Sequence, residues 1–170
     1  MTVMEAIQKR RSIRKYSDQP IEEDKLQRVL EAARLSPSAG NQQNWKFIVV
    51  RDADKRAKLM DAAKQQLFVG QAPAIIVACG TEPRGIMTCG QPRYTVDLSI
   101  AVAYMILEAA EIGLGTCWLG RFDENKVKAV LGIPDEVRVV SMFPLGYPEE
   151  SPPPRSRKKI EEIVCYDQYS

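Results

Sequence analysis

Apolar residues follow a helical spacing in some segments of the chain and form short continuous runs in others. In the segment 21–35, Leu26, Val29 and Ala33 recur at the three- and four-residue spacing of one helix face, with acidic residues in the first turn. The same analysis predicts helices at 4–10, 54–68, 93–114 and 123–131, the last capped by Asp123, and strands at 45–50, 74–79, 116–119 and 137–145. Strands separated by helices predict an α/β or α+β sandwich.

The longest expected helix, residues 93–114, is apolar around its whole circumference. Val96 and Leu98, for example, lie on nearly opposite sides of such a helix. A helix of this kind is buried on several sides. Because a small domain cannot bury it fully, the pattern predicts a homodimer.

The segment Gly113-Leu114-Gly115 follows this helix and leads into a strand. A dinucleotide-binding fingerprint has the reverse order, since it follows a strand and opens a helix. We therefore interpret Gly113 as the C-terminal cap of the helix.

The length of 170 residues and an apolar content of 45% predict one domain, 1–170, in which 151–170 form a C-terminal tail after a proline-rich connector. The net charge of +2 argues against a nucleic-acid-binding protein. No apolar run has the length of a membrane span, and Glu5 interrupts the position of a signal peptide, so we expect a cytoplasmic protein without a membrane partner.

The chain has no histidine, and its four cysteines are widely spaced. This composition argues against a metal site and excludes Ser-His-Asp and Cys-His catalysis. Any chemistry must therefore come from other side chains or from a cofactor.

A basic block near the start of the chain has the composition of a phosphate site. In extended backbone, Arg10, Ser12 and Arg14 would lie on one side, with Arg11 and Ile13 on the other. Guanidinium and hydroxyl groups on one face suit a phosphate, and a second basic cluster follows at 155–159. Taken alone, each cluster is better interpreted as a solvated basic surface.

A second polar block, residues 36–45, follows the helix at 21–35. Its proline, serine, glycine and asparagine residues favour turns for local reasons as well. Trp45 at its end, and Trp118 further along, are expected to pack in the core.

Together these blocks resemble the FMN-dependent nitroreductase family from end to end. The motifs that carry the resemblance are Arg-Arg-Ser-Ile-Arg at 10–14, Ser-Pro-Ser-Ala-Gly-Asn-Gln-Gln-Asn-Trp at 36–45, Gly-Leu-Gly-Thr-Cys-Trp-Leu-Gly at 113–120, Leu-Gly-Ile-Pro at 131–134, Pro-Leu-Gly-Tyr-Pro at 144–148 and Arg-x-Arg at 155–157. Asn44 stands where the family often has proline. The resemblance implies a three-layer α+β sandwich, with a central, mostly antiparallel sheet flanked by helices, in an intertwined dimer with two FMN sites.

The resemblance also implies a role for individual residues in FMN binding. Arg10, Arg11 and Ser12 would hold the phosphate and ribityl chain with Arg155 and Arg157, and Arg14 would face the N1 and O2 edge of the flavin, where reduction leaves negative charge. Pro37, Ser38, Ala39, Asn41 and Gln42 would come from the partner chain, and backbone groups of Leu119 and Gly120 would meet N5 and O4. No residue would act as a protein acid or base.

The activity implied is ping-pong hydride transfer from NADH or NADPH through flavin N5 to a small-molecule electron acceptor: a nitroaromatic, a quinone or an activated alkene. Two alternatives stay open at this point, namely a non-enzymatic flavin-binding sensor and another flavin chemistry on the same scaffold.

Overall fold

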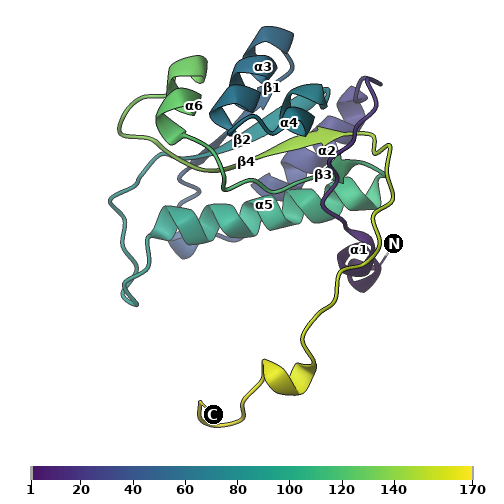
Figure 1. The fold of residues 1–170 in the computed structure, drawn as a ribbon. Coiled ribbons are helices and arrows are strands. Elements are labelled where there is room, and N and C mark those ends of the chain that lie inside the picture. Colours follow the sequence, from purple (N-terminus) through teal and green to yellow (C-terminus); the bar gives the residue numbers. More distant parts are fainter. Residues whose placement is uncertain (1, 170) are drawn as a thin grey trace.

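The computed structural model describes residues 2–169, which form a four-stranded sheet with helices on both faces (Figure 1). The strands are β1 (Trp45–Val50), β2 (Ala74–Gly80), β3 (Gly115–Thr116) and β4 (Arg138–Gly146). Their order in the sheet is β1-β2-β4-β3, and all neighbouring strands run antiparallel. The expected α+β class with an antiparallel sheet is confirmed.

The helices form the outer two layers of the sandwich. They are α1 (Val3–Lys9), α2 (Glu23–Arg34), α3 (Ala53–Ala62), α4 (Leu67–Gln71), α5 (Arg93–Glu111) and α6 (Glu124–Leu131), with short 3-10 turns η1 (Ala39–Asn41) and η2 (Ile160–Glu162). Alternate residues of β2 face opposite layers: Ile76 packs with α2 and α5, whereas Ile75 and Val77 pack with α3, α4 and α6. The expected three-layer arrangement is therefore correct.

Helix α5 is buried on one side and open on the other. Leu98, Val102 and Met105 are fully buried against the sheet, whereas Ala103 and Tyr104 on the outer side are exposed. The helix ends as expected, because Gly113 adopts a φ of +82° and its N–H donates to Ala110 O at 3.4 Å. One chain alone thus leaves an apolar face of α5 unburied.

The expected helix at 54–68 is wrong, because the chain forms two helices there. Helix α3 ends at Ala62, and Lys64 and Gln65 adopt left-handed φ angles of 58° and 59° before α4 begins. This break folds α4 back onto α3, where Gly70 lies against Met60 so closely that a Cβ at Gly70 would come within 3.2 Å of the Met60 sulfur. Lysine and glutamine are good helix formers, so nothing in the local sequence marks the break.

The expected strand at 116–119 is shorter in the structure. Strand β3 covers only Gly115–Thr116, and pairing resumes with an isolated bridge between Leu119 and Met142. In this register Cys117 would stand opposite Pro144, which has no N–H to donate. The ladder is interrupted at that point.

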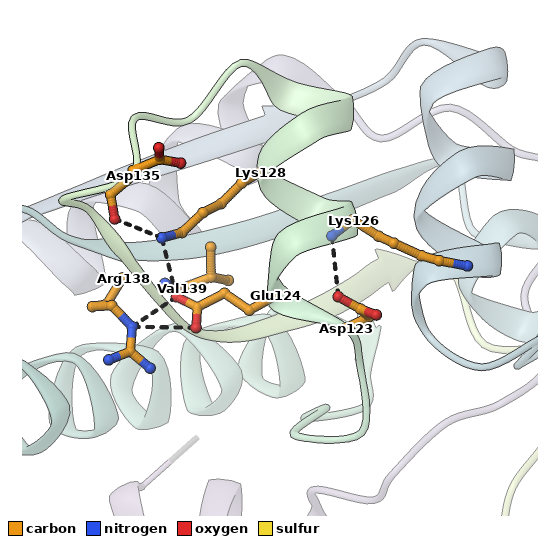
Figure 2. A network of polar contacts seen from close by, with 7 residues as sticks. All are labelled: Asp123, Glu124, Lys126, Lys128, Asp135, Arg138 and Val139. Atoms are coloured by element: carbon orange, nitrogen blue, oxygen red, sulfur yellow. Dashed lines mark hydrogen bonds and ion pairs between the residues drawn. The ribbon is translucent and has the colours of Figure 1, made fainter.

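Helix α6 is tied to β4 by one carboxylate (Figure 2). Glu124 accepts hydrogen bonds from Arg138 Nε at 2.9 Å and from the Val139 N–H at 2.8 Å, and it forms an ion pair with Lys128 at 3.7 Å. Partial burial acts to raise the pKa of Glu124, but these contacts outweigh it and hold the pKa below its usual value. The network therefore holds the start of α6 against the start of β4.

The chain leaves the sheet after β4 and extends away from the helices, as the yellow segment of Figure 1 shows. All residues from Pro153 to Tyr169 are exposed, including large apolar side chains at Ile160, Ile163 and Tyr166. Within residues 2–169, no helix is long and apolar enough to cross a membrane.

Candidate functional site

The basic segment 10–16 is held in place by β3 and by the chain that follows β4. The Ile13 N–H donates to Thr116 O at 2.9 Å, and Tyr16 forms a bridge to Pro148. The Tyr16 hydroxyl donates to Ile13 O at 2.6 Å, and burial raises the pKa of Tyr16 far above its usual value, so it stays a donor. A Cβ at Gly115 would lie 2.8 Å from the Ile13 side chain, so glycine permits this close approach.

This arrangement brings the two basic clusters together around one hollow of about 520 Å³. It is lined by Ile7, Gln8, Arg10, Arg11, Ser12, Arg14, Pro152, Pro153, Pro154, Arg155 and Arg157. Arg11 lines the same hollow as Arg10 and Arg14, so the strict alternation expected for an extended segment is wrong. Residues 10–16 do not form a regular strand. The side chain of Ile13 is nevertheless buried in the core.

The donors in this hollow fit a phosphate dianion. Five arginines line it without any carboxylate in the lining, and none of the five forms an ion pair within residues 2–169. Arg11 Nε is buried and has no hydrogen-bond partner in the same part of the chain, although Arg11 Nη1 donates to Gln8 O at 2.6 Å. Buried donors without partners are rare in folded proteins, and a bound oxyanion would satisfy this one.

Arg14 lines the hollow and also lies over an aromatic ring. Its guanidinium carbon lies 5.9 Å from the centre of the Phe68 ring, and its backbone N–H donates to the Glu150 carboxylate. Behind it, burial raises the pKa of Cys117, partly offset by the positive charge of Arg14 and by a hydrogen bond with Ser12. Sequence reasoning missed Phe68, because one aromatic residue in an apolar segment is normally assigned to the core.

The residues predicted to come from the partner do not line this hollow. Ser38 and Ala39 are half-buried, and Pro37, Asn41 and Gln42 are exposed. The Ala39 N–H donates to Asp97 Oδ1 at 3.0 Å, which places the segment beside the start of α5. Arg10 and Ser12 instead share a smaller hollow with Ile106, nine residues further along α5, a rise of roughly 14 Å.

Leu119 and Gly120 have different backbone environments. The Leu119 N–H donates to Met142 O at 2.9 Å, so that amide is used within the sheet. The Gly120 N–H has no partner within residues 2–169, and no atom lies within 4 Å of the position of a Cβ on Gly120. Of the two residues, Gly120 therefore offers the open backbone donor.

Trp118 is not in the core, contrary to expectation. Its exposed fraction is 40%, and it lines the smaller hollow of about 270 Å³ with Arg10, Ser12 and the outer face of α5. Trp45 is half-buried and packs against the core between the sheet and α5, as expected. Sequence pattern did not separate the two, because either position lies in an apolar strand-like run.

Comparison with known proteins gives a consistent result. The nitroreductase family model matches residues 7–94 and 65–147. An NADH dehydrogenase of Thermus thermophilus is 31% identical over an alignment of 195 positions. The match covers 93% of this chain and 92% of that protein. A nitroreductase family protein from Clostridium novyi is 37% identical and superposes with a TM-score of 0.84 over 89% of this chain and 87% of its own.

A second solved structure is the NADPH:FMN oxidoreductase from Vibrio harveyi in complex with NAD+. It is 27% identical and superposes with a TM-score of 0.92, covering 99% of this chain and 78% of its own. Fold, motif order and family match agree over nearly the whole chain. The protein belongs to the nitroreductase family of NAD(P)H and flavin oxidoreductases.

Proposed function

We propose that the protein is an FMN-dependent oxidoreductase that takes electrons from NADH or NADPH and reduces nitroaromatics, quinones or activated alkenes. The observation that carries the proposal is the hollow that is lined by five arginines and by no carboxylate. The family match and a relative named for NADPH and FMN support the choice of ligand. We treat residues 1–170 as one FMN-binding domain.

The two basic clusters divide the binding task. Arg10, Arg11 and Ser12, together with Arg155 and Arg157, would hold the phosphate and ribityl chain through charge-assisted hydrogen bonds. Arg14, whose guanidinium lies over the Phe68 ring, would stabilise the negative charge that develops on the flavin. FMN, when bound, supplies hydride acceptance from NAD(P)H at N5 and electron delivery to the second substrate.

A homodimer would complete each site. The segment containing Ser38 to Gln42 lies near the start of α5, whereas Arg10 and Ser12 lie beside Ile106. Two α5 helices packed antiparallel about a twofold axis would bring the start of one beside the later turns of the other. The partner's loop would then face the arginine-lined hollow of this chain.

The exposed apolar surface has the distribution that such a dimer requires. Val3, Met4 and Ile7 of α1 are exposed, and a groove of about 570 Å³ separates α1 and α2 from the outer face of α5 at Tyr104 and Leu107. The C-terminal tail adds further exposed apolar side chains. A second copy would bury these surfaces together, giving the intertwined dimer.

Turnover of a reduced nicotinamide tests the proposal. Under anaerobic conditions, purified protein supplied with FMN should turn over NADH or NADPH repeatedly only when a nitroaromatic, quinone or activated alkene is present, with parallel-line ping-pong kinetics. Protein that binds FMN but oxidises neither nicotinamide would be a flavin-binding sensor, and the proposed activity would be wrong. Protein without FMN provides the background rate.

A further inference from the structure

Asp97 is a buried carboxylate for which the proposed chemistry has no use. It lies in the second turn of α5, and only 5% of the residue is exposed. Its Oδ1 accepts a hydrogen bond from the N–H of Ala39, a residue 58 positions earlier in the chain, at 3.0 Å. A buried charge is costly unless it is hydrogen-bonded, so this contact has a structural purpose.

The segment that Asp97 holds has an unusual backbone. Gly40, Asn41 and Gln43 all adopt left-handed φ angles, of 60°, 53° and 53°. Non-glycine residues disfavour this region, although asparagine tolerates it better than most. Ser38 stabilises the turn from within, since its Oγ accepts from the Gln43 N–H at 3.0 Å. The turn nevertheless needs an external contact to fix its position on the protein.

Arg93 supplies a second contact from the same face of α5. Its guanidinium donates to Gln42 Oε1, an oxygen that also accepts from Asn44 Nδ2 at 3.1 Å. Arg93 and Asp97 are four residues apart in one helix and therefore lie on the same side. The start of α5 thus holds the segment at its backbone and at a side chain.

We infer that Asp97, assisted by Arg93, is a positioning residue that shapes the segment Ser38–Gln42 for the flavin site of the opposite subunit. The inference rests on the proposed function and extends it. Among the described residues, Asp97 hydrogen-bonds to Ala39 and not to the lining of the basic hollow, so its effect on FMN would pass through the Ala39 amide. It therefore acts across the dimer interface.

Asp97→Ala, Asp97→Asn and the control Thr95→Ala test the hydrogen bond to Ala39. Removal of the acceptor in Asp97→Ala should weaken FMN binding by about tenfold or more, measured by flavin fluorescence quenching at the same dimer fraction. Asp97→Asn keeps an oxygen acceptor and should restore most of the affinity. Thr95→Ala, an exposed change two residues earlier in α5, should have no effect. Wild-type affinity in Asp97→Ala, or equal loss in Asp97→Asn, would overturn the inference.

Ala39→Pro tests the same bond from the other partner if Asp97→Ala folds poorly. Proline removes the donor N–H, and the extended backbone of Ser38, with φ −141° and ψ 155°, is compatible with a following proline. The expected loss of FMN affinity matches that of Asp97→Ala. Unchanged affinity in this variant would contradict the positioning role.

A mixed dimer tests whether Asp97 acts across the interface. One subunit carries Asp97→Ala, the other carries Arg155→Ala with Arg157→Ala, and differently tagged copies are co-expressed so that only heterodimers are isolated. Action in trans leaves one intact site per heterodimer, so one FMN should bind with wild-type affinity. Action within one chain leaves no intact site.

The outcomes separate this inference from the proposed function. Wild-type protein that binds FMN, beside a heterodimer without a wild-type site, would overturn the inference alone. Wild-type protein that takes up no FMN would overturn the proposed function and the inference together.

Discussion

Leu119 and Met142 exchange backbone hydrogen bonds, with Leu119 N–H to Met142 O at 2.9 Å and Met142 N–H to Leu119 O at 3.4 Å. This pair continues the register of β3 with β4 beyond the gap opposite Pro144. It consumes the Leu119 amide and leaves the next amide, that of Gly120, pointing out of the ladder without a partner within residues 2–169. A single backbone donor is thus left open one residue after the bridge to β4.

Replacing Gly120 by proline should remove that donor and slow reduction of bound FMN by NAD(P)H, by roughly threefold to tenfold for the loss of one neutral hydrogen bond. Stopped-flow reduction of FMN-saturated protein measures the rate. Gly120→Ala keeps the N–H and has open space for its methyl group, so it should reduce at the wild-type rate. Equal rates in the proline and alanine variants would exclude this donor.

Removal of Arg155 or Arg157 should weaken FMN affinity by about 1.5–3 kcal/mol, the usual range for a charge-assisted hydrogen bond. The midpoint potential of the bound flavin should barely change, because these groups would contact the phosphate and not the ring. Lys158→Ala, a neighbouring change outside the hollow, is the matched control. Titration of apoprotein with FMN at fixed ionic strength measures the difference.

Arg14→Ala should change the midpoint potential, which removal of Arg155 or Arg157 should leave nearly unchanged. In FMN-saturated protein it should lower the flavin midpoint potential and slow hydride acceptance, because it removes the cation nearest to the charge formed on reduction. A redox titration beside the Arg155→Ala variant makes the comparison. An unchanged potential in Arg14→Ala, or a large drop in Arg155→Ala, would show that the two roles are assigned wrongly.

Ala103→Glu should break the dimer and, with it, FMN binding. Ala103 is exposed on the outer face of α5, so a glutamate there would be buried without a partner when two copies associate. Sedimentation should show monomers that take up no FMN. Ala57→Glu makes the same change at an exposed alanine on α3 and should stay dimeric and yellow. A flavin-loaded monomer would contradict the two-chain site.

Ionised Glu124 should stabilise the protein, so the free energy of unfolding should fall in acid. Its folded pKa is depressed, so its stabilising contribution is complete above the unfolded value near 4.5 and is lost as pH falls through the folded value. Urea unfolding across this range should show wild-type stability approaching that of Glu124→Gln as pH decreases. Glu136→Gln, at an exposed position in the loop between α6 and β4, is the control. Parallel curves for wild type and Glu124→Gln would rule out the contribution.

Most of the fold is readable from the sequence because periodicity depends on burial, and burial decides these elements. Leu26, Val29 and Ala33 are all buried, as their helical spacing predicts. The failures occur where a long-range partner sets the backbone. Lys64 and Gln65 leave the helix because α4 packs on α3, and the strand at 116–119 is interrupted opposite Pro144, which lies far along the chain.

The candidate site, like the fold, could be predicted from the sequence only in part. Residue chemistry identified the basic clusters at 10–14 and 155–157, which the fold brings to one hollow. Phe68 had no sequence signal for its position, because its importance comes from its contact with Arg14. The exposure of Trp118 likewise depends on which residues pack on the outer face of α5. The local sequence pattern does not contain that information.

FMN titration of the apoprotein tests whether the five arginines and a second subunit together form an FMN site. Absorbance and flavin fluorescence, combined with sedimentation, should give one FMN per subunit in a dimer, bound more tightly than FAD. A colourless protein that takes up no added FMN at any concentration where the dimer is intact would show that the five arginines and the second subunit form no FMN site.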